Sequence, residues 1–188
     1  GPKRAWARAL QQGGLTLDDL SLVETHDCFT IAELLEYEAM GLAAPGQGHR
    51  VIEEGVTLKG GRLPVNPSGG LKSKGHPIGA TGVSMHVLCA MQLRGQAGDM
   101  QIKDARLAGL FNMGGAGVAN YVSILEALRD AGHATSSSCE SGTCGTCKTR
   151  LLGGEADHRD MVLMEEEKGD HIMICVSRAK SGRLVLDL

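Results

Sequence analysis

Apolar residues recur at helical spacing in three stretches of the first two thirds of the chain. Residues 2–12 place Trp6 on the apolar face of a predicted helix that ends at a glycine pair. Residues 30–40 carry apolar side chains three and four positions apart and stop at Gly41, the residue type that most often ends helices. A third helix is predicted over residues 81–93.

Short apolar runs between these helices are typical of buried strands. Residues 20–24, 106–111 and 118–124 are rich in Leu, Val, Ile and Phe. The last two are joined by a glycine-rich loop at 112–117, and residues 41–61 are expected to be irregular. This alternation of helices and strands predicts an α/β fold for the first part of the chain.

Composition and charge exclude two classes of partner. The net charge is −3 with a pI near 6.2, and no run of Lys and Arg is present that would neutralise a nucleic-acid backbone. No apolar stretch reaches the ~20 residues needed to span a bilayer. Neither a nucleic acid nor a membrane is therefore expected as a partner. No signal peptide is recognised, so a cytoplasmic location is expected.

Four cysteines of the second part have the spacing of a plant-type two-iron, two-sulfide cluster. They are Cys139, Cys144 and Cys147, followed 28 positions later by Cys175 on a predicted strand at 172–176. Small residues between the first three let backbone N–H groups approach the sulfurs closely. Zinc is the main alternative, although structural zinc sites usually pair two CxxC-like knuckles. A disulfide scaffold is disfavoured in the absence of a signal peptide.

The sequence CESGTCGTCKTRLLGGEADHRDMVL, residues 139–163, resembles the C-terminal ferredoxin module of oxygenase reductases of the phthalate-dioxygenase-reductase type. The resemblance implies a small α+β ferredoxin-like β-grasp module. It also implies a 2Fe-2S cluster held by the four cysteines, and a flavin reductase or an oxygenase as redox partner. The family's module begins with a β-hairpin that has no counterpart here, so a truncated module is expected.

Two histidines and a cysteine in the first part are candidates for chemistry. His26 and Cys28 precede the predicted helix at 30–40, where the positive end of the helix dipole would favour a thiolate. His76 lies between Gly75 and Pro77 in a loop that leads into the helix at 81–93. From position alone, a buried cysteine and hydrogen-bonded structural histidines are the alternative interpretation.

Three segments of the first part together resemble the C-terminal half of a thiolase. They are ETHDCF at 24–29, NPSGGLKSKGHPIGATG at 66–82 and NMGGAG at 112–117. The HDCF sequence is similar to the sterol-carrier-protein-X branch, in which this cysteine is the catalytic acid/base. The resemblance covers about residues 1–125 and implies half of a layered α/β/α fold.

The thiolase resemblance also implies roles for individual residues. Cys28 would remove the α-proton of an acyl-CoA thioester, and His76 would donate to the enolate oxygen. His26 would replace the asparagine that positions a second donor in other thiolases. The backbone of Gly114 and Gly115 would lie beside the nucleophile.

The chain is therefore predicted to have two domains, a thiolase C-terminal-like domain at 1–125 and a ferredoxin-like domain at 126–188. The two resemblances overlap at 123–126. Thiolases carry their nucleophilic cysteine in the N-terminal half of the fold, so activity would need such a half or a homo-oligomer. One hypothesis is an acyltransferase domain joined to an electron-transfer module. The alternative is an electron-transfer protein in which the thiolase-like part is a non-catalytic scaffold.

Overall fold

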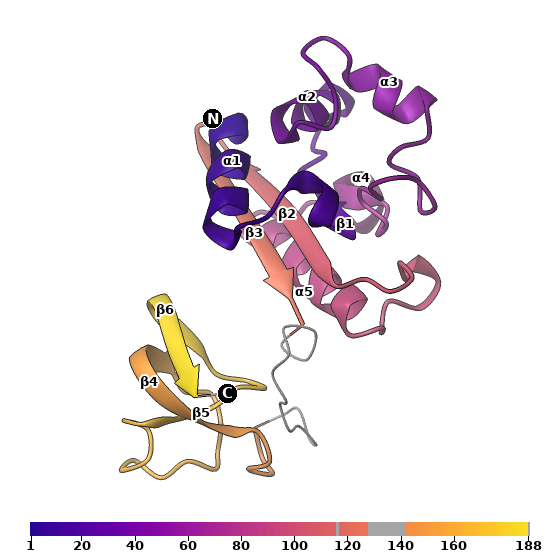
Figure 1. The fold of residues 1–188 in the computed structure, drawn as a ribbon. Coiled ribbons are helices and arrows are strands. Elements are labelled where there is room, and N and C mark those ends of the chain that lie inside the picture. The colour runs from indigo at the N-terminus through magenta and orange to yellow at the C-terminus, as the bar shows by residue number, and fades with distance from the viewer. Residues whose placement is uncertain (116, 128–141, 188) are drawn as a thin grey trace. The chain divides into compact units, whose positions relative to one another are not determined.

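The computed structural model describes residues 1–115, 117–127 and 142–187 (Figure 1). The chain divides into two compact units, Gly1–Ala127 and Leu128–Leu188. The sequence-based boundary after residue 125 lies close to this division.

The first unit contains helices and strands in alternation around a three-stranded sheet with the order β1-β2-β3. Its elements are α1 (Pro2–Gly13), the 3-10 turn η1 (Leu17–Asp19), β1 (Leu22–Glu24), α2 (Thr30–Met40), α3 (Gly48–Glu53), α4 (Gly70–Lys74), α5 (Thr81–Leu93), the 3-10 turn η2 (Gly98–Met100), β2 (Leu107–Gly114) and β3 (Ala119–Glu126).

The strand β2 lies between the other two and pairs with each in a different sense. β1 runs parallel to it, with Leu22 opposite Ala108. β3 runs antiparallel to it, and their register ends with Gly114 opposite Ala119. The end of β1 and the end of β2 therefore lie at the same edge of the sheet, because parallel strands point the same way.

The sheet has an apolar core on each face, since successive strand residues point to opposite sides. On one side Phe111 packs with Trp6 of α1. On the other side Leu110 packs with Met85 of α5. Helices thus cover both faces of the sheet, which confirms the predicted layered α/β fold.

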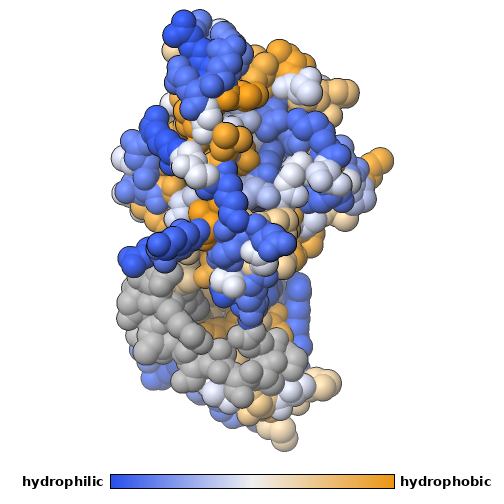
Figure 2. All heavy atoms as spheres, turned by 90° about the vertical axis from the view of Figure 1, so that its right-hand side faces the viewer, coloured by the Kyte–Doolittle hydropathy of each residue, from blue (hydrophilic) through white to orange (hydrophobic). Residues whose placement is uncertain are grey.

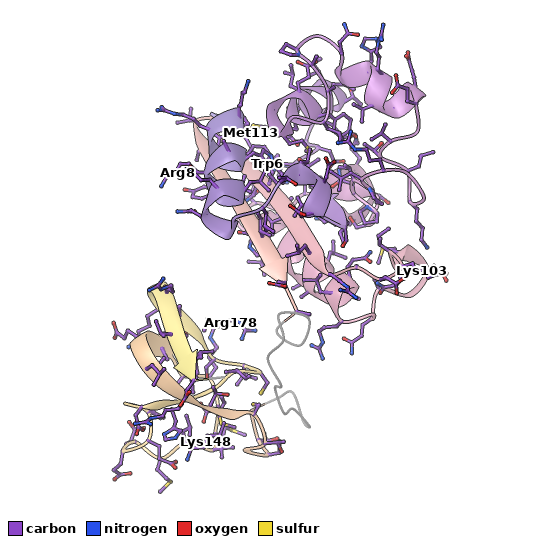
Figure 3. The ribbon with its side chains drawn as sticks, in the orientation of Figure 1. Trp6, Arg8, Lys103, Met113, Lys148 and Arg178 are labelled. Carbon is purple, nitrogen blue, oxygen red and sulfur yellow. The ribbon has the colours of Figure 1, made fainter. Side chains whose placement is uncertain are left out.

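The indole of Trp6 is 1% exposed and fixes α1 on the sheet (Figure 3). It lies over Gly109 of β2, where an added Cβ would come within 3.0 Å of the ring. Glycine at this strand position is explained by that close approach. The helix ends at Gly13 and is capped by Gly14, which has a φ of 65°, a conformation that glycine adopts without strain.

Several predicted elements need correction. Residues 41–61 are not entirely irregular, because they contain the short helix α3. The glycine-rich stretch before His76 also forms a short helix, α4. β2 extends through Asn112 to Gly114, so the predicted loop at 112–117 shrinks to the turn after Gly114. Backbone pairing with β3 outweighs the low strand propensity of Asn112 and Gly114.

The second unit contains a small antiparallel sheet with the order β5-β4-β6. The strands are β4 (Lys148–Asp157), β5 (His171–Met173) and β6 (Arg178–Asp187). The predicted strand at 172–176 is too long, since β5 ends at Met173 and Cys175 lies in the turn that follows. A small sheet of this kind agrees with the predicted ferredoxin-like module.

Apolar side chains also reach the surface of the first unit. Figure 2 shows orange, apolar residues interspersed with blue, polar ones on the face it presents. Phe29, just before α2, and Ile31 and Leu35 within it are each more than half exposed, as are Val83 and Val87 of α5. Among the described helices, none is both long enough and apolar enough to cross a bilayer.

Candidate functional site

A cavity of about 1150 Å³ lies in the first unit and brings the three predicted catalytic residues together. Its wall includes His26, Cys28 and His76, which are separated by up to 50 positions in the sequence. The wall also includes α2 residues, the start of α5 and the end of β2. Met113 at the end of β2 is one of the lining residues (Figure 3).

His26 is buried directly after β1 and is fixed by β2. Its Nδ1 lies 2.7 Å from Oδ1 of Asn112. An amide oxygen only accepts hydrogen bonds, so Nδ1 carries the proton. Burial lowers the pKa of His26, despite the opposing effect of the Asn112 hydrogen bond. The ring is therefore neutral at pH 7, and its Nε2 has a lone pair available to accept a hydrogen bond.

Asn112 is a site residue whose role the sequence did not reveal. Its side-chain nitrogen would lie only 2.7 Å from a Cβ added to Gly82, the second residue of α5. The amide thus fits against a helix position that must lack a side chain. Since Asn112 stood in a predicted loop, only its position in the NMGGAG segment could have drawn attention to it.

His76 is exposed at the mouth of the cavity and is oriented by α5. Its Nδ1 lies 2.7 Å from the Thr81 hydroxyl, which lies 3.0 Å from the Pro77 carbonyl oxygen. When that hydroxyl donates to Pro77, His76 donates from Nδ1 and leaves Nε2 as an acceptor. When the hydroxyl turns to Nδ1 instead, the proton of the neutral ring resides on Nε2, which then donates.

The two imidazole rings meet edge to face. Their centroids are 4.8 Å apart and their planes make an angle of 86°. In each ring Nδ1 is used to hold the side chain, by Asn112 for His26 and by Thr81 for His76. Both Nε2 atoms are then left for a bound molecule.

Cys28 is partly buried in a tight turn between β1 and α2. Its backbone N–H donates to the carbonyl oxygen of His26 at 2.9 Å. Burial and the negative charge of Glu36 raise the pKa of the thiol. Backbone hydrogen bonds from Phe29 and Cys28 itself lower it, but these have the smaller effect. The expected preference for a thiolate at the start of α2 is therefore not observed.

The turn that carries Cys28 is anchored by a buried acid, Asp27. Its Oδ1 accepts the backbone N–H of Leu71 at 2.7 Å, and its Oδ2 lies 3.5 Å from Nζ of Lys72. The carboxylate also occupies the space that a Cβ on Gly70 would need. Asp27 thus joins the HDCF segment to α4 and fixes both, which is a positioning role the sequence did not indicate.

Gly114 and Gly115, whose backbone is expected beside the nucleophile from the thiolase resemblance, line the cavity. Gly114 is the last residue of β2, and Gly115 has a φ of 56° in the turn that follows. Ala116 lies outside the described residues. The backbone of these glycines is thereby exposed to the cavity at the same edge as His26.

In the second unit, the described cysteines lie on two neighbouring segments. Cys144 is exposed. Cys147 is 3% exposed and packs with Leu163 and Met173 in a buried cluster. Cys175 is partly buried and packs against this cluster. Cys139, the fourth predicted ligand, lies outside the described residues. Within residues 142–187, no group of three or more His, Cys, Asp or Glu side chains is gathered as for a metal ion.

The backbone of the cysteine segment fits a cluster-binding loop. Gly142 and Gly145 have φ angles of 75° and 79°, which glycine adopts most readily. A Cβ on Gly142 would lie 2.7 Å from the side chain of Val176, next to Cys175. The loop therefore approaches the Cys175 turn as closely as glycine permits. Thiolate donors from these two segments are the ligand type that iron–sulfur clusters require.

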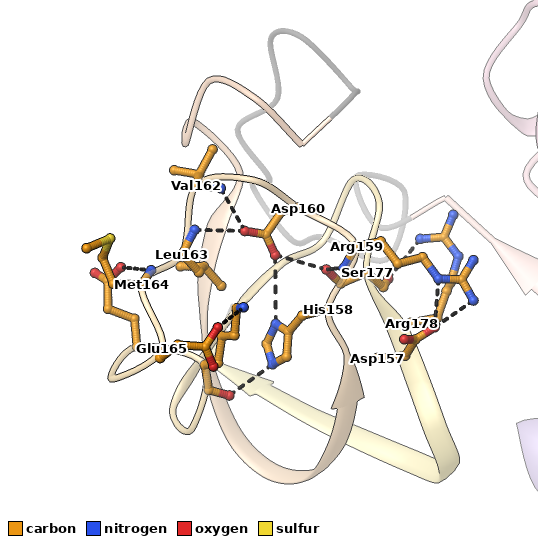
Figure 4. A network of polar contacts seen from close by, with 12 residues as sticks. Asp157, His158, Arg159, Asp160, Val162, Leu163, Met164, Glu165, Ser177 and Arg178 are labelled. Atoms are coloured by element: carbon orange, nitrogen blue, oxygen red, sulfur yellow. Dashed lines mark hydrogen bonds and ion pairs between the residues drawn. The ribbon is translucent and has the colours of Figure 1, made fainter.

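Asp160 joins the loop at residues 160–163 to Ser177, two positions after Cys175 (Figure 4). Its Oδ1 accepts the backbone N–H groups of Val162 and Leu163 at 3.1 and 2.8 Å, and the Ser177 hydroxyl lies 3.4 Å from its Oδ2. Burial is the largest single effect and raises the pKa of Asp160, but the backbone N–H groups of Leu163, Val162 and Asp160 itself, together with His158, lower the pKa below its usual value. The charged carboxylate thus holds the region beside Cys175 in place.

Two family models match this chain. Residues 1–127 match the thiolase C-terminal domain-like model, and residues 118–180 match the 2Fe-2S iron-sulfur cluster binding domain. The matches overlap over residues 118–127, which include the stretch where the two resemblances coincide. Both predicted relationships are confirmed.

Relatives of the first part include sterol carrier protein 2 from Homo sapiens, which is 46% identical over 112 residues, 60% of this chain and 20% of that protein. An acetyl-CoA acetyltransferase from Methanothermobacter thermautotrophicus is 46% identical over 109 residues, 58% of this chain and 28% of that protein. The chain thus spans less than a third of the length of these relatives.

The second part is similar to phthalate dioxygenase reductase from Burkholderia cepacia, with 73% identity over 66 residues, 35% of this chain and 20% of that protein. Among solved structures, the Ltp2-ChsH2(DUF35) aldolase matches with a TM-score of 0.61 and 25% identity, over 68% of this chain and 32% of that one.

Proposed function

Residues 1–127 belong to the thiolase C-terminal domain-like family, and on that premise we propose that they form and stabilise the enolate of an acyl-CoA thioester. Carbon–carbon bonds next to a thioester are made or broken through such an enolate. The observation that carries the proposal is the meeting of His26, His76 and Cys28 in one cavity.

In the proposed reaction Cys28 is the acid and base. As a thiolate it removes the α-proton of the thioester, and as a thiol it returns a proton to the leaving group. The raised pKa of its thiol suits a base that must take a proton from a weak carbon acid. Sulfur then holds that proton until it is passed on.

The two histidines are proposed to stabilise the oxygen on which negative charge develops. His76 donates from Nε2 when the Thr81 hydroxyl is turned to its Nδ1. Neutral His26 accepts from a water molecule with its Nε2, and the water directs its second hydrogen to the same oxygen. Removing one preplaced donor of this kind typically slows a reaction about 100- to 1000-fold.

The nucleophile of an acyl transfer is proposed to come from a thiolase N-terminal half or a second subunit. Cys89 is unsuited to that role, because it is 0% exposed in α5 and burial raises the pKa of its thiol to about 12. The part that supplies the nucleophile would decide which acyl group is transferred, and whether the carbon–carbon bond is cleaved or formed.

Exchange of the α-protons of acetyl-CoA in D₂O tests this proposal without a nucleophile. The full chain should catalyse deuterium incorporation, measured by mass spectrometry. Cys28→Ala should abolish the exchange, and His76→Ala should slow it about 100-fold. Cys175→Ser, a change in the other unit, is the control and should leave the rate unchanged. Exchange no faster than in buffer would contradict the proposal.

The second part is a 2Fe-2S electron-transfer module, which supplies single-electron transfer when the cluster is bound. We propose Cys139, Cys144, Cys147 and Cys175 as its ligands, and a flavin reductase or an oxygenase as its redox partner. Iron and acid-labile sulfide analysis of anaerobically purified protein should give two irons per chain. A colourless preparation with one zinc per chain would contradict the ligand assignment.

A further inference from the structure

The two histidines that meet in the cavity present different hydrogen-bonding groups to a bound molecule. Asn112 holds the proton of His26 on Nδ1 at 2.7 Å, so Nε2 of His26 is an acceptor. When the Thr81 hydroxyl is turned to Nδ1 of His76, at 2.7 Å, the Nε2 of His76 is a donor. The ring centroids are 4.8 Å apart. One acceptor and one donor are thus offered to neighbouring atoms of the same molecule.

A third histidine of the cavity wall does not share this arrangement. His86 of α5 lines the cavity, but its Nδ1 lies 2.7 Å from the Gly82 carbonyl oxygen. Its Nε2 lies 3.1 Å from the Ser123 hydroxyl. Both ring nitrogens of His86 are therefore used within the protein, and the acceptor and donor for a ligand come from the other two rings.

The thiol of Cys28 is the third reactive group of the cavity, and at neutral pH it carries its proton. Burial is the main cause that raises the pKa of this thiol, and the acids Glu36 and Asp27 raise it further. A protonated thiol gives a proton before it takes one. At rest the cavity therefore combines a neutral base, His26, with an acid.

A β-hydroxyacyl-CoA thioester matches these three groups. Its hydroxyl and its thioester carbonyl are borne on carbons that are separated by one other carbon, Cα, so one molecule can contact two rings this close together. Retro-aldol cleavage of such a thioester produces an enolate, which then needs a proton on Cα. It requires no attacking thiol. This matters because the only other cysteine of residues 1–127, Cys89, is 0% exposed.

We propose that the first unit cleaves β-hydroxyacyl-CoA thioesters by a retro-aldol reaction, with His26 as base, His76 as donor to the enolate oxygen and Cys28 as acid. Nε2 of His26 takes the hydroxyl proton, and the hydroxyl oxygen becomes a carbonyl oxygen as the bond between Cα and Cβ breaks. The electron pair of that bond moves onto the thioester, where Nε2 of His76 donates to the oxygen.

The remaining steps balance without any further reactant. The S–H bond of Cys28 breaks and a C–H bond forms on Cα, which gives a shortened acyl-CoA. The carbon that bore the hydroxyl leaves as an aldehyde or a ketone. The proton on His26 returns through water to the Cys28 thiolate, so both groups regain their resting state. Each side chain acts on a different atom of the substrate, and no contact among the three is required.

The inference rests on the enolate stabilisation of the proposed function, but a different substrate tests it. The probe is 3-hydroxy-3-phenylpropanoyl-CoA, since Phe29, Leu35 and Val83 line the cavity and favour an apolar substituent. The full, cluster-loaded chain without free CoA should release benzaldehyde and acetyl-CoA in equal amounts, measured by chromatography. Benzaldehyde release no faster than in buffer would overturn the inference.

Variants of two histidines test which ring is the base. His26→Ala should slow benzaldehyde release about 100-fold or more, because a general base typically contributes that much. His86→Ala is the matched control in the same cavity wall, and its rate should follow wild type because both nitrogens of His86 are engaged within the protein. Equal slowing in the two variants would overturn the assignment of His26 as base.

The pH dependence of wild type is a second measurement that needs no variant. Cleavage uses the thiol of Cys28, so its rate should fall at alkaline pH, whereas α-proton exchange uses the thiolate and should rise. Glu36, with a pKa of about 8, and Asp27 oppose ionisation of the thiol and move both changes to higher pH. Cleavage and exchange rates that rise together would overturn the assignment of Cys28 as acid.

Towards acid pH, the cleavage rate should fall only below the ordinary histidine pKa of 6.5. Burial lowers the pKa of His26, and His76 and Lys74 lower it further, against the opposing effects of Asn112 and Asp27. The two proposals also fail separately. Deuterium exchange into acetyl-CoA without benzaldehyde release would overturn the retro-aldol inference alone. Absence of both reactions would overturn the proposed function as well.

Discussion

The two units of this chain relate their reactive groups to their cores in different ways. In the first unit the apolar core surrounds Trp6 and Phe111 on one face of the sheet and Leu110 on the other. The reactive side chains His26 and Cys28 stand at the edge of that sheet; Cys28 packs against the second cluster, but neither residue is among the buried members of the two clusters. In the second unit the described buried cluster is Cys147, Leu163 and Met173, so a predicted metal ligand is itself part of the core.

The candidate site of the first unit is therefore held in place by the surrounding fold, whereas the candidate site of the second unit contributes residues to the core of its fold. The first unit can hold His26 and Asp27 in place through hydrogen bonds to Asn112 and Leu71, whatever is bound. In the second unit, metal–thiolate bonds and core packing involve the same residues. Metal binding and folding are then expected to be coupled.

Substituting a ligand should give the largest effect and should separate the two units. Cys175→Ser is expected to abolish the two-iron absorption in the visible, since four thiolates are needed to hold the cluster. Unfolding of the first unit should be unchanged when followed by fluorescence of Trp6, the chain's single tryptophan. Cys28→Ser is the control and should keep the full cluster content. Equal loss of cluster in both variants would mean that the units are not independent.

The next largest effect is expected from pH. Burial raises the pKa of Glu36 from 4.5 to about 8, so between these values the folded chain keeps a proton that the unfolded chain loses. The free energy of unfolding of the first unit should therefore fall as pH rises through this window, by at most about 1.4 kcal/mol per pH unit.

Glu36→Gln should remove this fall. Urea unfolding followed by Trp6 fluorescence should find the variant similar to wild type at pH 5 and more stable at pH 9. The cluster absorption of the second unit should not differ between the two proteins. If wild type and variant lose stability in parallel from pH 5 to 9, Glu36 is not protonated in the folded chain.

A smaller effect is expected from Gly82→Ala. Alanine normally stabilises a helix relative to glycine, but here its Cβ would lie 2.7 Å from the Asn112 amide nitrogen. Displacing that amide should free His26, slow α-proton exchange and destabilise the first unit by about 1–3 kcal/mol. Gly60→Ala, with open space around the added Cβ, serves as the comparison. A more stable Gly82→Ala chain with normal exchange would show that Asn112 does not fix His26.

The smallest effect is expected from Asp160→Asn. A neutral amide accepts more weakly from the N–H groups of Val162 and Leu163, and we expect a loss of about 1–2 kcal/mol in the second unit. The temperature at which the cluster absorption bleaches should fall, while the Trp6 signal is unaffected. Asp170→Asn removes an exposed pairing with His171 and should have little effect. The reverse ranking of the two variants would rule out a special role for Asp160.

The sequence was most informative where spacing and chemistry coincide. Helices α2 and α5 were predicted with the bounds that the structure has, because apolar spacing and flanking glycines agree. The motifs also indicated His26, Cys28 and His76, which the cavity unites. The functional roles of these residues stay predictions.

What the sequence could not supply depends on contacts between distant segments. Asn112 holds His26 across 86 positions, and Asp27 holds the N–H of Leu71 across 44. Glu36 looks like an ordinary helix acid in the sequence, and only burial against Thr25 makes it unusual. Residues 112–114 were wrongly predicted as loop, because pairing between β2 and β3 is not visible in local propensity.

The central place of β2 has a consequence for how the cavity can open. Its backbone amides are shared with strands on both sides, and Phe111 and Leu110 are 0% exposed on its two faces. Amide hydrogens of this strand should exchange with solvent only when the whole unit unfolds, and those of the short helix α3 should exchange much earlier. The edge of the cavity that bears Asn112 is therefore expected to stay in place when a substrate binds.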